Sequence, residues 1–552
     1  MSSSKSFDHL STVSVTETTE QKLPKSFRWV SLLGIAFSLT NSWLGVSSSL
    51  VVGLSSGGPL LIIYGLIIGL VFTFMCGCSL AEFSSILPNS SGACFWVLKM
   101  LERRDDAERI IVDGPKRIQS ESDSESEAEE KVLEWACTTK SVKVTSKFQR
   151  STALAVGLIN YLGAVFTSAS VFSSLSLSIL GVHQLLNPDY ELKHWHIFVV
   201  YQILNVIITV TNCCQKILPA LSQFGLYMSL LACLLTFILS LVCRSNQSSI
   251  EWPKTSGIFG EFKNTTGWSS SPMAFIVGLI NPLWAFAGID SATHMVDEVG
   301  YKPSKKLVPR AIFCTILIGF VTSFTYAIGM FYCITDAEKV TESILPILEI
   351  YYQATGNRKL SVFMQCCCIV TGLSCGVASV TWQSRILWSI GRDFSKLSDK
   401  NPISRKAMQF FGIVNTKLKA PLNSHLFSQL LVAIIGCIFM GSSTAFNAII
   451  TACITLLLLS YAIPCAILLI IGKKPFFSRI RKEFASIGLC TEDGPTLSIL
   501  AYVPNVLTIC WALFCLVFLS FPYSLPVDSG NMNYVSVVYG AVALAIGILV
   551  YV

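Results

Sequence analysis

The sequence predicts an all-α integral membrane protein with about twelve transmembrane helices, arranged as a five-plus-five inverted repeat whose first and sixth helices are broken. Three observations support this prediction. Apolar residues make up 52% of the 552 residues and charged residues only 13%, and the mean hydropathy is +0.61. Apolar windows of about 20 residues, the length that crosses a bilayer, recur along the chain. Two of these windows, the first and the sixth, are interrupted near their middle by residues that break a helix.

The first apolar window follows a polar tail rich in Ser and Thr, residues 1–28, which is expected to be disordered and cytosolic. The window runs from Trp29 to Leu54 and is interrupted between Thr40 and Gly45. A broken helix persists in lipid only where its freed backbone groups line a cavity or bind a ligand. Freed N–H groups at the start of the second half-helix suit a carboxylate, because the helix dipole is positive there. The residues expected to bind substrate in this span are Asn41, Ser42, Trp43 and Gly45.

The second span, expected from Leu60 to Phe83, leads into an interfacial segment that ends at residue 98. Residues 99–150 then form an acidic insertion containing the run Ser120 to Lys131, which is too polar to fold alone and is expected to be disordered and cytosolic. Its serines lie beside carboxylates, a pattern that suits acidophilic kinases, although a plain solvated loop is an equal alternative. The candidate phosphorylation sites are Ser120, Ser122, Ser124 and Ser126.

Spans three to five are expected within residues 151–243, and a polar loop at residues 244–272 separates them from the sixth span. This loop contains two N-glycosylation sequons, at Asn246 and Asn264, which can be used only on the outer side of the membrane. The remaining divisions are spans six to ten at 273–471, a basic cytosolic loop at 472–498, and spans eleven and twelve at 499–552.

The sixth span, Met273 to Gly300, is interrupted by Pro282, Gly288 and Asp290. A carboxylate near the middle of a membrane is costly unless it is paired, hydrated or protonated, so Asp290 is a candidate functional group. Freed carbonyl groups near the break, together with Asp290, suit a substrate ammonium, and aromatic side chains can cover an apolar chain. The alternative is a proline-kinked helix whose aromatic residues serve only packing. The residues expected to bind substrate in this span are Trp284, Phe286, Ala287, Gly288 and Asp290.

Ionisable residues follow the sixth-span break at helical spacing. His294 is four residues after Asp290 and Asp297 is seven after it, so on a continuous helix the three share a face and can relay protons toward the cytosol. The alternative for His294 is a hydrogen bond to a backbone carbonyl. Charged residues near the inner ends of spans are expected to form gate ion pairs, with simple interfacial charges as the alternative. The gate candidates are Glu82, Asp297, Glu298, Arg385 and Arg392.

Lys and Arg are distributed asymmetrically between the two sides of the membrane. With the amino terminus inside, 33 of them fall on its side and 7 on the other, which together are the 40 of the chain. The positive-inside rule then places both termini in the cytosol. Because the basic residues flank spans, the net charge of +7 needs no nucleic-acid partner. The 20 cysteines lie mostly in apolar segments, and the sequence contains no metal-ligand spacing, catalytic motif or cofactor motif, so no enzyme, metal or cofactor is expected.

Several motifs resemble the amino acid-polyamine-organocation superfamily. They are the two broken spans, the series Glu82…Pro88…Gly92…Trp96, Asp297-Glu298-Val299 and Gly391-Arg392-Asp393. Thr40-Asn41-Ser42-Trp43 and Gly278-Leu279-Ile280-Asn281-Pro282 resemble its fungal branch, which carries choline, 4-aminobutyrate, polyamines and biotin precursors. The resemblance covers nearly the whole membrane region and implies the leucine-transporter-like fold.

The resemblance also implies a function. It is that of a secondary transporter in the plasma membrane, importing a small amino-bearing metabolite by alternating access with a proton as the expected coupling ion. The substrate it implies most closely is the biotin precursor 7-keto-8-aminopelargonic acid. The partners are then a zwitterionic or cationic substrate and the lipid bilayer. The alternatives are a permease for choline, 4-aminobutyrate or polyamines, and a transporter-like nutrient sensor.

Overall fold

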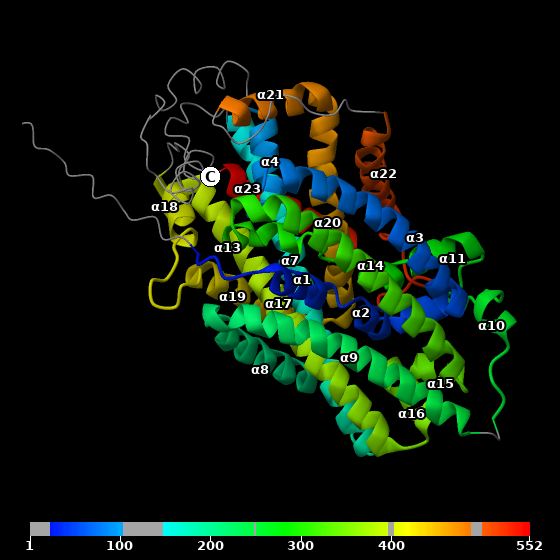
Figure 1. The fold of residues 1–552 in the computed structure, drawn as a ribbon. Coiled ribbons are helices and arrows are strands. Elements are labelled where there is room, and N and C mark those ends of the chain that lie inside the picture. The colour runs from blue at the N-terminus through cyan, green and yellow to red at the C-terminus, as the bar shows by residue number, and fades with distance from the viewer. Residues whose placement is uncertain (1–22, 103–146, 248–249, 396–401, 487–498, 552) are drawn as a thin grey trace, which may run out of the picture.

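A computed structural model describes residues 23–102, 147–247, 250–395, 402–486 and 499–551 (Figure 1). Most of the tail and of the acidic insertion, including the four candidate phosphorylation sites, lies outside the described residues. The described chain is helical, with no strand in these ranges. The elements are α1 (Trp29–Thr40), α2 (Ser42–Ser48), α3 (Leu50–Ile86), α4 (Ala93–Met100), α7 (Lys147–Leu186), α8 (His194–Asn212), η1 (Gln215–Ile217), α9 (Leu218–Ser245), α10 (Thr255–Phe259), α11 (Ser271–Gly278), α12 (Ile280–Trp284), η2 (Ser291–Met295), α13 (Val296–Val299), α14 (Tyr301–Cys333), α15 (Ala337–Glu342), α16 (Pro346–Thr355), α17 (Arg358–Ser395), α18 (Pro402–Phe411), α19 (Leu422–Gly441), α20 (Ser443–Ile471), α21 (Lys473–Ser486), η3 (Ile499–Tyr502), α22 (Val503–Phe518) and α23 (Val535–Tyr551).

The membrane architecture agrees with the prediction. Within the described ranges, 8 helices are long and apolar enough to cross a membrane. Four shorter apolar helical stretches complete the predicted set of spans: Ser271–Trp284, Leu422–Ile438, Val503–Phe518 and Val535–Val550.

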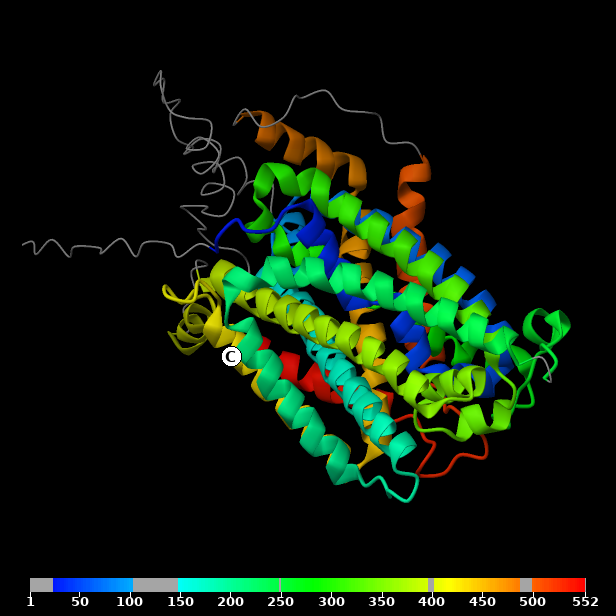
Figure 2. The same cartoon turned by 60° about the horizontal axis from the view of Figure 1, so that its bottom comes forward.

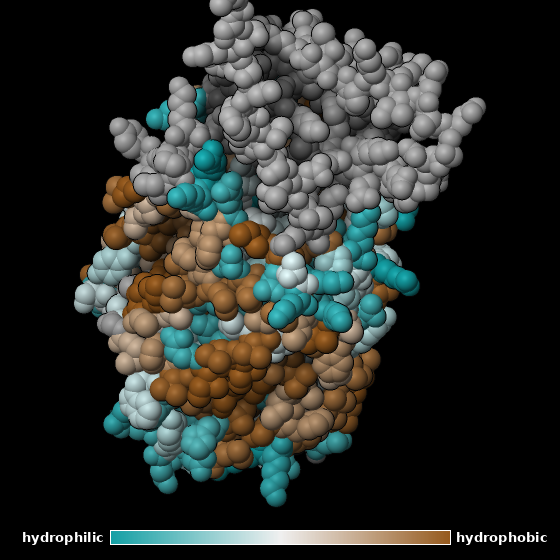
Figure 3. All heavy atoms as spheres, turned by 90° about the vertical axis from the view of Figure 1, so that its left-hand side faces the viewer, coloured by the Kyte–Doolittle hydropathy of each residue, from teal (hydrophilic) through white to brown (hydrophobic). Residues whose placement is uncertain are grey.

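Large apolar side chains cover the outer surface of the helix bundle. On α8, Val206 is 63% exposed and Val210 is 65% exposed, and on α9 Leu234 is 57% exposed. Figure 3 shows a band of such hydrophobic residues around the face it presents, with hydrophilic residues at its lower edge. A continuous apolar surface of this kind is unfavourable in water, and lipid covers it in a membrane protein.

Helices at equivalent positions of the two predicted repeats pack against each other. The second and seventh spans, α3 and α14, run side by side in both ribbon views (Figures 1 and 2). The third and eighth spans, α7 and α17, also pack together, as do the fourth and ninth, α8 and α19. Pairing of equivalent spans is expected when two repeats are related by a pseudo-two-fold axis in the membrane plane.

The first span is broken at a single residue. Asn41 has a left-handed backbone, with φ 33° and ψ 54°, which ends α1 and allows α2 to begin at Ser42. Asn tolerates this conformation better than most residues because its short polar side chain can bond locally. The helical path of the first span continues through Leu50–Leu54 into the first part of α3, and Gly58, whose φ of 70° is not helical, separates that part from the second span.

The sixth span is broken over a longer stretch. It ends its first half at Trp284, passes through Gly288 with φ 79°, and resumes as η2 and α13. Pro282 contributes to the first interruption, because α11 ends at Gly278, four residues before it, where the proline has no N–H to donate and its ring crowds the carbonyl. The longer break follows Trp284 and is passed through Gly288.

The two breaks lie against each other in the centre of the bundle. Asn281 of α12 is fully buried, and its side-chain nitrogen donates to the Val46 carbonyl at 3.1 Å and to Ser49 Oγ at 2.6 Å. Figure 1 shows α18 and α21 at one end of the bundle and α10, α15 and α16 at the opposite end. Following the Lys and Arg distribution, we refer to the end with α18 and α21 as the inner end.

Candidate functional site

A narrow internal cavity of about 60 Å³ lies between the two helix breaks. Four elements supply its walls: the first span, α7, the sixth span and α17. No Asp, Glu, Lys, Arg or His is among its lining residues. They are Leu39, Thr40, Asn41, Leu44, Gly45, Ser48, Thr167, Val171, Ser174, Leu175, Ser178, Trp284, Ala287, Cys368, Gly372 and Cys375.

The cavity is elongated along the bundle. Its wall on α7 extends from Thr167 to Ser178, which is about 16 Å of helix at 1.5 Å per residue. The wall on α17, which runs in the opposite direction, extends from Cys375 at the inner end to Cys368 at the outer end. The cavity therefore has a long axis from the inner side toward the outer side.

Four of the predicted substrate-binding residues line this cavity, namely Asn41, Gly45, Trp284 and Ala287. Trp43 does not, because its ring is fully buried against Tyr326 at 5.0 Å between ring centroids and its indole N–H donates to Ser229 Oγ at 3.0 Å. The other predicted residues outside the lining are Ser42, Phe286, Gly288 and Asp290.

Asp290 lies in a polar cluster on the inner side of the cavity. Its side chain is 2% exposed and accepts hydrogen bonds from the Tyr461 hydroxyl at 2.8 Å and from Asn160 Nδ2 at 2.9 Å, while His294 Nε2 lies 3.2 Å away. Asn160 is seven residues before Thr167 on α7, which places this contact about 10 Å inward from the cavity wall. Asp290 thus connects the sixth-span break to α7 and α20.

His294 continues this series of contacts toward the inner end. Its Nδ1 lies 2.6 Å from the Ser90 carbonyl, and Ser90 Oγ accepts from the Asp297 backbone N–H at 3.0 Å. Gly92 makes this contact possible, since it has φ 53° and a Cβ there would lie 2.8 Å from the His294 ring. The same ring therefore has the expected carbonyl partner and also lies beside Asp290, whereas the proton relay stays a prediction.

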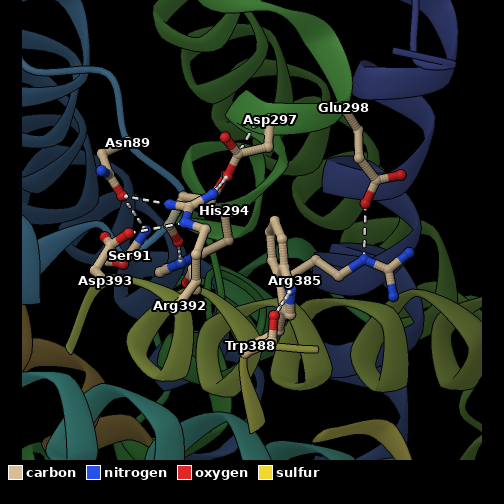
Figure 4. Close-up of polar contacts among 12 residues, drawn as sticks. Asn89, Ser91, His294, Asp297, Glu298, Arg385, Trp388, Arg392 and Asp393 are labelled. Atoms are coloured by element: carbon tan, nitrogen blue, oxygen red, sulfur yellow. Dashed lines mark hydrogen bonds and ion pairs between the residues drawn. The ribbon is translucent and has the colours of Figure 1, made fainter. Parts of the chain in front are cut away.

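Two ion pairs extend from α17 toward α13 near the inner end (Figure 4). Arg385 Nε lies 2.7 Å from Glu298 Oε1, both side chains are almost fully buried, and Gln215 hydrogen-bonds to both of them. Arg392 Nη1 lies 2.5 Å from Asp297 Oδ2. The expected gate candidates from the sixth span and α17 are therefore brought together.

The Arg392 pair is part of a wider cluster. Arg392 Nε also lies 2.8 Å from Asp393 Oδ1, whose other oxygen accepts from Ser91 Oγ at 2.6 Å. The guanidinium carbon lies 4.8 Å from the centre of the Trp388 ring, a cation–π geometry. Figure 4 shows these groups converging between α17, α13 and the segment before α4.

Glu82 forms a different pair. It lies 2.7 Å from Lys473 Nζ, which also donates to Asn505 Oδ1 at 2.9 Å. This pair joins α3 to the start of α21 and to α22, and within the described ranges it makes no hydrogen bond or ion pair with the charged residues of α17.

The two sequons differ in their surroundings. Asn246 is exposed at the end of α9. Asn264 is engaged in a turn, because its Nδ2 donates to the Trp268 carbonyl at 2.7 Å and its Oδ1 accepts from Thr266 Oγ1 at 2.6 Å.

Sequence reasoning missed the α7 and α17 walls of the cavity and the partners of the acidic residues. Asn160 and Tyr461 were not among the residues predicted for the site. A tyrosine hydroxyl and an amide in the middle of apolar spans need hydrogen-bond partners in lipid, and that requirement is the signal that could have found them.

Comparison with known proteins identifies the family. Residues 138–543 match the family model described as "Amino acid permease". The chain is 55% identical over 540 residues to the "7-keto 8-aminopelargonic acid transporter" of Saccharomyces cerevisiae, which covers 98% of this chain and 94% of that protein. It is 38% identical over 522 residues to the "Choline transporter" of the same yeast, covering 94% of this chain and 80% of the relative. The yeast "Polyamine transporter TPO5" is 23% identical over 520 residues, with coverages of 92% and 72%.

Proposed function

Since the chain belongs to the amino acid permease family, we propose that it is a secondary active transporter that imports 7-keto-8-aminopelargonic acid across the plasma membrane together with protons. The observation that carries the choice of substrate is the 55% identity, over nearly the whole length of both chains, to a transporter named for this compound. The Lys and Arg distribution supports cytosolic termini.

The chemistry of the cavity fits this substrate. At neutral pH 7-keto-8-aminopelargonic acid carries a carboxylate at one end and an ammonium beside a ketone at the other, with methylene groups between. The lining combines hydroxyl groups with apolar side chains and contains no ionised residue, so it can contact both poles and the methylene chain without a permanent ion pair. At about 60 Å³ the cavity must widen to admit the whole substrate, as alternating access requires. We propose Asn41, Gly45, Trp284 and Ala287 as direct substrate contacts.

Asp290 had two expected roles, substrate contact and proton coupling. Its burial among Tyr461, Asn160 and His294, away from the cavity lining, supports the coupling role. We propose that its protonation state determines how firmly the inner half of the sixth span is bound to α7 and α20. The ion pairs Glu298–Arg385 and Asp297–Arg392 are then candidates for the inner gate that separates during alternating access.

A choline permease is the second candidate, because of the 38% identical relative. Quaternary ammonium groups are usually held by several aromatic faces. The cavity lining contains one aromatic residue, Trp284, among its described members. This observation favours the amino-keto acid over choline.

The test is uptake of each labelled compound by cells that lack their own permeases for both. We expect saturable uptake of 7-keto-8-aminopelargonic acid that increases as external pH falls and collapses with a protonophore. Choline uptake without uptake of the amino-keto acid would overturn the substrate assignment, and insensitivity to the protonophore would overturn proton coupling. A tagged protein counted at the cell surface provides the normalisation.

A further inference from the structure

We propose that Leu44, Leu175 and Gly372 form a waist in the cavity, and that the transporter selects substrates that extend through this waist with the ammonium directed inward and the carboxylate outward. This inference rests on the proposed function and specifies how the site distinguishes an extended amino acid from a compact cation. The three residues come from α2, α7 and α17 and all line the cavity.

The width of the waist is determined by the absence of a side chain at position 372. A Cβ on Gly372 would lie 2.5 Å from Leu175 Cδ2 and 3.7 Å from Leu44 Cδ2. Real Cβ atoms do not approach other carbons to 2.5 Å, so the Leu175 side chain occupies the space that glycine leaves, and Leu44 lies at ordinary contact distance beside it. The walls of the cavity are therefore apolar and close together at this level.

Polar residues lie on both sides of the waist. On α7, Ser178 is one turn outward from Leu175, and Thr167 is eight residues inward. On the first span, Ser48 is four residues beyond Leu44 and Thr40 is four residues before it. The waist thus separates an outer polar region from an inner one, as the poles of an extended zwitterion require.

The hydroxyl groups of the inner region suit a cation. Thr167 Oγ1 donates its proton to the Gly163 carbonyl at 2.8 Å, and Thr40 Oγ1 donates to the Phe37 carbonyl at 3.2 Å. Each oxygen then offers only lone pairs to the cavity, which accept from an ammonium. The Asp290 cluster, further inward along α7, adds acceptor character on this side.

The outer region suits an anion. On the outer side, the Ser178 hydroxyl makes no hydrogen bond within the described residues and can donate to a carboxylate, whereas Ser48 Oγ already donates to the Gly45 carbonyl at 2.9 Å. Beyond Ser178, a separate outer groove of about 430 Å³ contains Lys339 and Arg358, although Glu342 and Glu349 also line it. The orientation therefore rests on the Ser178 hydroxyl on the outer side and on the Thr40 and Thr167 oxygens on the inner side, rather than on the groove.

The experiment measures how ω-amino acids of increasing length inhibit uptake of labelled 7-keto-8-aminopelargonic acid. We use 4-aminobutyrate, 6-aminohexanoate and 8-aminooctanoate, with choline as the compact cation. In the unmodified transporter, inhibition should strengthen at least tenfold from 4-aminobutyrate to 8-aminooctanoate, since a short chain leaves one pole inside the apolar waist. Equal inhibition at all lengths would overturn the proposal.

Two variants change the waist in opposite directions. Gly372→Ala forces the Leu175 side chain into the passage, so the half-saturation for the amino-keto acid should rise about tenfold while inhibition by choline changes less. Leu175→Ala removes volume, so the preference for the longer amino acids should fall about tenfold. If Gly372→Ala does not reach the surface, Leu175→Ala still decides the question, because it introduces no crowding.

Gly376→Ala is the matched control. A Cβ there would be nearly as crowded, at 2.7 Å from Ile208 Cδ1, but Gly376 does not line the cavity. The surface abundance of Gly376→Ala should decrease, and its preference for longer ω-amino acids should not change. A change in that preference equal to the change in Gly372→Ala would overturn the waist.

Ser178→Ala tests the orientation. It should weaken inhibition by 8-aminooctanoate about tenfold, the usual effect of losing a hydrogen bond to a charged group, and leave inhibition by choline unchanged. An equal effect on both compounds would overturn the orientation. Absence of any uptake of the amino-keto acid by the unmodified transporter would refute the proposed function itself, which separates that failure from failure of the waist.

Discussion

The cavity between the helix breaks and the ion-pair cluster at the inner end contrast in how they use charge. The cavity lining contains no ionised residue, whereas the cluster contains the buried pair Glu298–Arg385 and the half-buried pair Asp297–Arg392. A buried pair is strongly destabilised when one partner is removed. A neutral cavity has no such penalty and can be vacated at each cycle. Under the proposed function, neutral groups recognise the substrate and charged groups close the inner gate.

The largest effect should come from filling the cavity. A Cβ at Gly45 would lie 3.5 Å from Ala285 Cα and from Trp284 Cδ1, which is ordinary contact, so Gly45→Ala should keep most uptake. Gly45→Leu adds three more carbons inside a cavity of about 60 Å³ and should abolish uptake while the protein still reaches the surface. Uptake of labelled substrate measures transport, and counting the tagged protein at the cell surface measures delivery to the membrane. Normal transport by Gly45→Leu would exclude this cavity as the substrate site.

The next largest effect should come from the buried pair. Arg385→Met leaves the Glu298 carboxylate buried without its cation, at a cost of about 3–5 kcal/mol, so surface abundance and uptake should both fall more than tenfold. Replacing both residues by Met should restore abundance, because apolar residues of similar size tolerate burial. The exposed pair Lys339–Asp336 is the control, and Lys339→Met should change little. If the buried pair serves only stability, the double variant will regain full transport, and the gate role is then excluded.

Asp290→Asn distinguishes the cavity from the cluster directly. If Asp290 couples protons, the variant should lose accumulation against a gradient and its response to external pH, yet retain counterflow exchange. Its half-saturation should change less than threefold, because Asp290 does not line the cavity. A direct contact with the substrate ammonium would instead raise half-saturation roughly tenfold to a hundredfold. Wild-type behaviour in both assays would exclude both roles.

The smallest effect should come from deleting the acidic serine run. The segment Ser120 to Lys131 is too polar to enter the bilayer, so its removal should alter the half-saturation less than twofold. Surface abundance is the property expected to change. A shift in substrate preference would show that this segment influences the cavity and would refute the prediction.

The sequence by itself determined the membrane bundle and the place of the two breaks. Apolar windows of bilayer length must form helices, because only a helix satisfies the backbone hydrogen bonds of a single segment in lipid. The residues that interrupt these windows can be recognised directly in the sequence. The prediction of a break near Asn41 was confirmed because a short polar residue between apolar half-helices has a local signature. Pro282 likewise has a local signature, since α11 ends four residues before it.

Only the tertiary structure decided which residues share the cavity. Thr167 on α7 and Gly372 on α17 are more than 200 residues apart, and no local pattern relates them. The same holds for Asp290, whose partners Asn160 and Tyr461 lie 130 and 171 residues away. Hydropathy predicts which segments lie in lipid. It does not predict which side of a helix contacts another helix, because that depends on close packing of small and polar groups between assembled spans.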